Sequence, residues 1–165
     1  MNDVLQAIKT RRSVRQFANE SIAREEVEAI LEAGRWAPSG KNTQPWRFVV
    51  VQSPDKREEL AVLAPQAGMV AVAPMTLAVL LDRSAGYDPL KDAQGIGAAI
   101  ENILLAAHAL DLGACWMGAT RDAAIEAALG AKEGEELMAL IPIGHPAQQP
   151  GAGSRLPLAS ITRFI

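Results

Sequence analysis

The stretch WAPSGKNTQPWRFVVVQ, residues 36–52, joins a polar loop to the start of a sheet. Its first part, Trp36 to Pro45, is dense in residues that favour turns, and Pro38 and Pro45 restrict the freedom of the chain. Its second part, Arg47 to Gln52, is a β-branched run that is typical of a buried strand. The stretch therefore predicts a rigid polar loop that is anchored directly on a strand.

Two helices are predicted before this loop. The first follows Asn2, a capping residue, and its helical pattern of apolar residues ends at the basic cluster that begins with Arg11. The second follows Ser21, carries acidic residues near its start, and is expected to stop at Gly34. The polar loop is thus expected to begin just after the second helix.

Helices and strands continue to alternate after residue 52. We expect a helix that starts at Ser53-Pro54, a strand over 75–81, a helix over 96–112 with a left-handed cap at Gly113, a strand over 114–117, a helix over 120–130 with a cap at Thr120 and a stop at Gly130, and a strand over 137–143. This pattern indicates an α/β or α+β fold. The helix over 96–112 is apolar on nearly all sides, which predicts burial against a second subunit as well as its own sheet.

Length and composition set the broad class. The chain has 165 residues, of which 49% are hydrophobic, and these values predict one compact domain over residues 1–165. A charged fraction of 21% and a net charge of −3 argue against disorder and against a general nucleic-acid binder. The expected partner is therefore a small molecule or a protein.

Metal, disulfide and membrane classes are also disfavoured. One cysteine, Cys115, excludes an internal disulfide, and His108 and His145 form no cluster with zinc-site spacing. The polar N-terminal region predicts a cytoplasmic protein. Pro74 interrupts the apolar stretch over 69–81, and a spanning helix needs about 20 apolar residues, so no membrane segment is expected.

The segment Arg11-Arg12-Ser13-Val14-Arg15 is a candidate phosphate site. It follows the first helix and is predicted to run extended, so Arg11, Ser13 and Arg15 would point to the same side. Two guanidinium groups with a hydroxyl between them suit a phosphate. The alternative is that these cations only complement the C-terminus of the helix and are otherwise solvated.

The loop over 38–46 is a second candidate site. It holds hydroxyl, amide and backbone groups between two prolines, and such groups suit the several edge hydrogen bonds of a flat heterocycle. The alternative is an ordinary connection between elements. An ordinary connection would not require Asn42, Gln44 and Trp46 together.

Together the two motifs resemble the nitroreductase family of flavoproteins. The resemblance rests on Arg11-x-Ser13-x-Arg15 and Trp36-Ala-Pro-Ser-x-x-Asn-x-Gln-Pro-Trp46, and it continues through Asp92, Asn102-Ile-Leu-Leu-Ala-Ala107, Gly113-Ala-Cys-Trp-Met-Gly118, Ile141-Pro-Ile-Gly144 and Ser154-Arg-Leu-Pro157. It implies an α+β, three-layer sandwich with a central, mainly antiparallel sheet flanked by helices. It also implies an intertwined homodimer whose C-terminal tail, about residues 147–165, reaches across to the partner subunit.

The resemblance further implies a cofactor and a reaction. FMN would lie at the dimer interface, and hydride would pass from NADH or NADPH through flavin N5 to a small acceptor such as a nitroaromatic or a quinone. The reaction would be ping-pong and would need no catalytic side chain.

Individual residues match the family's cofactor contacts. The matched positions are Arg11, Arg12, Ser13, Arg15, Pro38, Ser39, Gly40, Asn42, Gln44, Cys115, Trp116, Met117, Gly118 and Arg155. Arg11, Ser13 and Arg155 match contacts to the phosphate and ribityl groups, and Pro38, Ser39 and Asn42 would come from the partner subunit. Arg15 would stabilise negative charge at flavin N1 and O2, and backbone donors at Met117 and Gly118 would meet N5 and O4.

The chain departs from many relatives at two places. Gln66 stands as a substitute for a polar residue that grips the pyrimidine edge of the ring, and the connection over 82–91 is short where some relatives insert helices. The short connection predicts an open, unselective pocket. Two alternatives remain: a specialised flavin enzyme of the same family, of the reductive dehalogenase or flavin-fragmenting type, and a non-catalytic dimeric flavin-binding or scaffold protein.

Three residues and one short motif that could suggest a functional role are expected to have only a structural one. Cys115 is expected to be a small apolar residue of a buried strand, His108 an interior or interface residue, and His145 an exposed loop residue. Gly95-Ile-Gly97 lacks the third glycine and the preceding strand of a dinucleotide-binding fingerprint.

Overall fold

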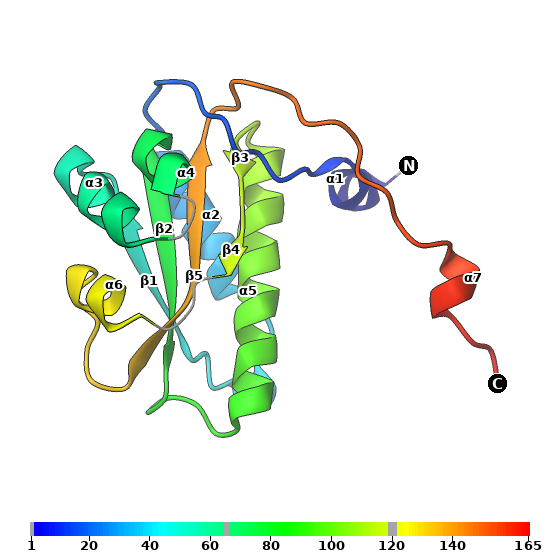
Figure 1. Ribbon diagram of the computed structural model, residues 1–165. Coiled ribbons are helices and arrows are strands. Elements are labelled where there is room, and N and C mark those ends of the chain that lie inside the picture. The colour runs from blue at the N-terminus through cyan, green and yellow to red at the C-terminus, as the bar shows by residue number, and fades with distance from the viewer. Residues whose placement is uncertain (1, 65–66, 119–121) are drawn as a thin grey trace.

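A five-stranded sheet lies between two layers of helices (Figure 1). The computed structural model describes residues 2–64, 67–118 and 122–165. In chain order the elements are α1 (Asp3–Thr10), α2 (Arg24–Arg35), the 3-10 turn η1 (Gly40–Asn42), β1 (Trp46–Val51), α3 (Pro54–Leu63), α4 (Ala67–Val72), β2 (Met75–Asp82), α5 (Pro89–Ala109), β3 (Gly113–Ala114), β4 (Met117–Gly118), α6 (Ala123–Ala128), β5 (Glu135–Gly144) and α7 (Leu158–Ile161). The predicted α+β sandwich is confirmed.

The strands named above pair antiparallel throughout. Their order is β1-β2-β5-β3, and β4 also pairs with β5. The two central strands, β2 and β5, are almost wholly buried, as expected for strands covered by helices on both faces. β1 lies at one end of the order, so one of its edges has no partner strand among the described residues.

Each face of the sheet has its own apolar core. Successive residues of a strand point to opposite faces, so Leu77 and Val79 pack with α2 and α5, whereas Ala78 and Leu80 pack with α3, α4 and α6. α5 contributes Ile100 to the first core with no exposed surface. These two cores fix the three layers seen in Figure 1.

Gly34 lies inside α2, so the predicted stop at this residue is wrong. A Cβ atom at Gly34 would lie 2.9 Å from side-chain atoms of Ile103 and 3.0 Å from Cζ of Phe48. The residue is therefore glycine because α2 packs closely on α5 and β1, and the helix continues for one more residue to Arg35.

The left-handed cap predicted at Gly113 is also wrong. The left-handed residue after α5 is Asp111, with φ of 58°, and Gly113 begins β3. A Cβ atom at Gly113 would lie 2.6 Å from Cβ of Val14. Because Gly113 has no side chain, Val14 can approach β3. The Val14 N–H then donates to the Ala114 carbonyl at 3.0 Å.

Other element boundaries differ from the predicted ones. α5 begins at Pro89 rather than near residue 96, because the Asp88 carboxylate caps its first turn by accepting from the Lys91 N–H at 2.9 Å. The strand expected over 114–117 is two short strands, β3 and β4, separated by Cys115 and Trp116. The predicted cap at Thr120 lies outside the described residues, and Asp122 caps α6.

The two ends of the chain carry exposed apolar surface. α1 buries no residue, and Val4, Leu5 and Ile8 are each at least half exposed. After Pro146 the chain leaves the sheet and runs to α7, which lies apart from the body in Figure 1. Phe164 near the C-terminus is 94% exposed. None of the helices within the described ranges is long and apolar enough to cross a membrane.

The close approach at Gly113 predicts the effect of adding one methyl group there. Gly113→Ala should lower the free energy of unfolding by about 1–3 kcal/mol, because the new Cβ meets the branched and rigid Val14. Urea denaturation followed by circular dichroism measures this. The control is Gly68→Ala in α4, where an added Cβ meets no atom within 4 Å and no loss is expected. Equal stability of the two variants would contradict this account of Gly113.

Candidate functional site

Four arginine residues line one cavity, whose volume is about 220 Å³. They belong to Arg11, Arg12 and Arg15 from the segment after α1 and to Arg155 from the C-terminal segment. The remaining lining residues are Ser13, Pro150, Gly151 and Gly153. The structure thus brings together two parts of the chain that are far apart in sequence, and both carry predicted site residues.

The Arg11 to Arg15 segment is extended, as predicted, because it lies beside β3. Ser13 forms a parallel bridge with Ala114, and Val14 is buried on the side that faces the core. Alternation along the segment then leaves Arg11, Ser13 and Arg15 on the side of the cavity. A second cavity of about 190 Å³ shares Ser13 and Arg15.

The arginines of this segment differ in their partners. Arg12 donates through Nη1 to the carbonyls of Lys9 and Arg11, both at 2.8 Å, so it complements the end of α1. Arg11 Nε is buried and makes no hydrogen bond with the part of the chain that the structure describes, although Glu101 Oε1 lies 3.5 Å away. A guanidinium group has donors only, so Arg11 retains capacity for an anion.

The loop between α2 and β1 holds three non-glycine residues in the left-handed region. Lys41, Asn42 and Gln44 have φ of 54°, 57° and 50°. The loop is closed by Ser39, whose hydroxyl accepts from the Gln44 N–H at 3.0 Å, and by the Gln44 side chain, which donates to the Asn42 carbonyl at 3.2 Å. Such a conformation persists only where the surroundings determine it.

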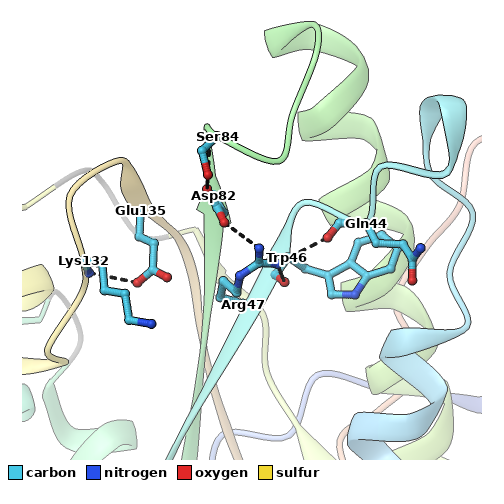
Figure 2. A network of polar contacts seen from close by, with 7 residues as sticks. All are labelled: Gln44, Trp46, Arg47, Asp82, Ser84, Lys132 and Glu135. Atoms are coloured by element: carbon cyan, nitrogen blue, oxygen red, sulfur yellow. Dashed lines mark hydrogen bonds and ion pairs between the residues drawn. The ribbon is translucent and has the colours of Figure 1, made fainter.

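Arg47 fixes the end of this loop, as Figure 2 shows. Its guanidinium donates to the Trp46 carbonyl at 2.8 Å and to the Asp82 carboxylate at 2.5 Å, and it lies 3.4 Å from the Gln44 carbonyl. The hydroxyl of Ser84 donates to Asp82 at 2.6 Å. This hydrogen bond lowers the pKa of the Asp82 carboxyl below its ordinary value; partial burial opposes the change, and the Ser84 N–H and the charge of Arg47 add to it.

The loop and the arginine-lined cavity contact α5 at different places. A Cβ atom at Gly95, near the start of α5, would lie 3.5 Å from Cβ of Ser39, whereas Thr10 is hydrogen-bonded to His108 near its end. The thirteen steps from Gly95 to His108 span about 20 Å of helix, and the six steps from Gly95 to Glu101, which lies 3.5 Å from Arg11 Nε, span about 9 Å. Figure 1 shows the loop before β1 at the lower end of α5 and the segment after α1 at its upper end.

The predicted cofactor-binding residues 115–118 offer mainly main-chain atoms for ligand contacts. The side chains of Cys115 and Met117 pack in the core formed with α3, α4 and α6, and burial raises the pKa of the Cys115 thiol. Trp116 is 43% exposed, and Gly118 has open space where a side chain would be. Any ligand contact made by Cys115 or Met117 would therefore involve main-chain atoms.

The two histidines lie outside the arginine-lined cavity. Thr10 Oγ1 donates to the Gln6 carbonyl at 2.8 Å, so His108 Nε2, also at 2.8 Å, donates to Thr10. His145 lies 3.8 Å from the Glu20 carboxylate. Within the described ranges, no group of three histidine, cysteine, aspartate or glutamate side chains is placed to hold a metal ion.

Some residues near the candidate site were not identified from the sequence. Pro150 and Gly151 complete the cavity, although they were predicted only as part of the C-terminal tail, about residues 147–165. Tyr87 lies against Gly40 in the loop before β1. The pair Asp88-Pro89, a cap followed by proline, would have indicated that an ordered helix start lies beside Tyr87.

The sequence and the fold of the chain match those of a known class of protein. Residues 8–66 and 63–145 match the model of the Nitroreductase family. The chain belongs to this family, as the sequence motifs predicted.

Three relatives are similar to this chain over most of their own length. A protein from Methanothermobacter thermautotrophicus with the provisional name NADH dehydrogenase/NAD(P)H nitroreductase is 37% identical over 90% of this chain and 80% of its own. A provisionally named nitroreductase from Desulfovibrio desulfuricans, solved in complex with FMN, is 44% identical, with a TM-score of 0.91 over 100% of this chain and 98% of its own. An NADPH:FMN oxidoreductase from Vibrio harveyi, complexed with NAD+, is 29% identical, with a TM-score of 0.89 over 99% of this chain and 77% of its own.

The lowered pKa of Asp82 predicts how its contribution to stability depends on pH. At neutral pH, Asp82→Asn should lower the free energy of unfolding by about 1 kcal/mol, because the charged hydrogen bonds to Arg47 and Ser84 are weakened. A carboxyl whose pKa is lowered in the folded state contributes its full stabilisation at pH values above its ordinary pKa of roughly 3.9. This stabilisation is lost as the pH falls through the lowered pKa. The difference between the variant and the wild type should therefore vanish in acid.

Urea denaturation between neutral pH and about pH 2 measures this difference. The control is Glu58→Gln, which removes one negative charge from an exposed position of α3. A difference for Asp82→Asn that stays constant over the whole range would show that the carboxylate charge does not stabilise this end of the loop.

Proposed function

We propose that the chain is an FMN-dependent oxidoreductase that transfers hydride from NADH or NADPH to a small acceptor such as a nitroaromatic or a quinone. The observation that carries this proposal is the cavity lined by four arginines and Ser13, in a chain that belongs to the nitroreductase family. The relatives that bear the names NAD(P)H nitroreductase and NADPH:FMN oxidoreductase, and the one solved with FMN, support it. We take residues 1–165 to be one domain.

The cavity suits the phosphate of FMN in charge and in hydrogen-bonding capacity. Its four arginines and Ser13 supply N–H and O–H donors, and the buried Nε of Arg11, which lies 3.5 Å from the Glu101 carboxylate, makes no hydrogen bond to any residue that the structure describes. When bound, FMN supplies the acceptor and donor of hydride at its N5 atom. No side chain of this site then needs to act as a nucleophile or base.

The protein's own residues bind and orient the cofactor. Arg11, Ser13 and Arg155 hold the phosphate end, and Arg15 places positive charge beside the pyrimidine part of the ring. Main-chain atoms of Met117 and Gly118 face the ring edge. Arg12 acts mainly by holding the end of α1, from which the Arg11 to Arg15 segment starts.

The polar loop completes the site from a second copy of the chain. Pro38, Ser39, Gly40, Asn42 and Gln44 would contact the ring. Within one subunit, however, the loop meets α5 near its start at Gly95, whereas Arg11 lies against Glu101 in the middle of α5 and the segment that carries the arginines starts from Thr10, beside the other end of the helix. A two-fold arrangement that pairs the α5 helices in opposite directions brings the loop of one subunit to the arginines of the other.

Exposed apolar surface supports this dimer. A groove of about 470 Å³ lies between α1, α2 and α5, with Val4, Trp36 and Leu105 among its lining residues. The tail carries exposed Leu158, Ile161 and Phe164, and β1 offers an open edge for a partner's chain. Each subunit would cover the other's groove and receive its tail.

The arginine-lined cavity predicts which substitutions weaken FMN binding. Arg155→Ala should raise the dissociation constant of FMN by about tenfold to a hundredfold, because a charge-assisted hydrogen bond contributes about 1.5–3 kcal/mol. Arg155→Lys should raise the dissociation constant of FMN by a smaller factor, since lysine keeps the positive charge but lacks the two parallel donors of the guanidinium group. Quenching of flavin fluorescence during titration of the apoprotein measures these constants.

The matched control is Arg24→Ala, which removes a cation paired only with Glu28 on the surface of α2. Anaerobic addition of NADH and then NADPH to the holoprotein should bleach the flavin absorbance and identify the donor. Bound flavin that neither nucleotide bleaches would favour a specialised flavin enzyme such as a reductive dehalogenase. A wild type that binds no FMN would exclude the proposed function.

The exchange of tails predicts the effect of a short deletion. Removal of residues 158–165 keeps Arg155 but takes away α7 and Phe164, so the dimer should dissociate and FMN binding should weaken by at least tenfold, because half of each site is lost. Sedimentation equilibrium measures the assembly state. A truncated chain that remains a dimer would show that the tail does not hold the subunits together, and a monomeric wild type would exclude the shared site.

A further inference from the structure

The ring of Tyr87 occupies the space where a side chain of residue 40 would lie. A Cβ atom built on Gly40 would be 2.3 Å from the Tyr87 hydroxyl oxygen and 2.6 Å from its Cε1 atom. Gly40 is not among the residues with positive φ, so its lack of a side chain is explained by this contact and not by its backbone conformation. The tyrosine therefore packs directly on the backbone of the polar loop.

Tyr87 also contacts the residue that follows Gly40. The Lys41 ammonium lies 4.6 Å from the centroid of the Tyr87 ring, in cation–π geometry. Lys41 is the first of the three left-handed residues of the loop. A single aromatic ring thus contacts the loop at the point where its unusual conformation begins.

The backbone of Tyr87 is held by a buried carboxylate. Asp92, which is 4% exposed, accepts hydrogen bonds from the N–H groups of Tyr87 and Asp88, each at 3.1 Å. A side chain at Gly86 would collide with Asp92, so the turn before α5 closes tightly on this carboxylate. Tyr87 is therefore presented from a fixed turn at the start of α5.

We infer that Tyr87 is a positioning residue for the flavin site: held by Asp92, its ring keeps Gly40 and Lys41 in the loop conformation that the flavin requires. The inference rests on the proposed function, because it concerns the loop that would contact the ring of FMN. The left-handed residues of the loop are costly for side-chain-bearing residues, so the loop needs an external contact to keep this shape. Tyr87 supplies that contact at Gly40 and Lys41.

A double-mutant cycle between Gly40 and Tyr87 tests this inference. Tyr87→Ala and Gly40→Ala should each raise the dissociation constant of FMN about tenfold, the first by removing the ring and the second by pushing a methyl group into it. The double variant should bind FMN no more weakly than Tyr87→Ala alone, because the methyl group then has space. Tyr87→Phe should bind within about twofold of the wild type, since it retains the ring.

Two further measurements separate positioning from general damage and from failure of the proposed function. Urea denaturation of the apoproteins should show similar stability for the wild type and all four variants, because Tyr87 is 43% exposed and its ring can move into solvent, unlike the buried Val14 beside Gly113. Val62→Ala at an exposed position of α3 should leave FMN binding unchanged. Additive losses in the double variant, or unchanged FMN binding in Tyr87→Ala, would overturn the inference while the proposed function stands. A wild type that binds no FMN would overturn both.

Discussion

The packing of α5 on the sheet is the constraint on which the other parts depend. Its buried stripe, centred on Ile100 and Ile103, fills the core between the sheet and α2. The same helix meets Ser39 through Gly95 near its start and Thr10 through His108 near its end. Any rotation of α5 would therefore displace both the polar loop and the segment that carries the arginines.

Local patterns predicted most of the elements. The β-branched run after Pro45 is β1, and Pro54 begins α3, because both signals act within a few residues of the structure they specify. The roles of Gly34 and Gly113 were not predictable in this way. Each glycine is required by a side chain distant in sequence, Ile103 in one case and Val14 in the other, so no local rule distinguishes it from a helix stop.

The residues of the candidate site also fall into those that a local sequence pattern predicts and those that it does not. Alternation along an extended segment was enough to place Arg11, Ser13 and Arg15 on one side, and they do line one cavity. The addition of Arg155 followed only from the family resemblance, since the tail contains no local signal for it. Tyr87 was missed because its partner, Gly40, precedes it by two helices and two strands, and only the folded chain brings them together.

The gathering of four arginines around one cavity has a consequence for the apoprotein. Like charges at short range repel one another, and the carboxylate of Glu101 lies 3.5 Å from one of the four arginines, Arg11. An anion that binds in the cavity offsets this repulsion, so it stabilises the folded chain by an amount that grows with the logarithm of its concentration once that concentration exceeds its dissociation constant. Phosphate or sulfate in a buffer then acts as a competitor for the same cavity, and the apparent affinity of the cofactor depends on the salt in which it is measured.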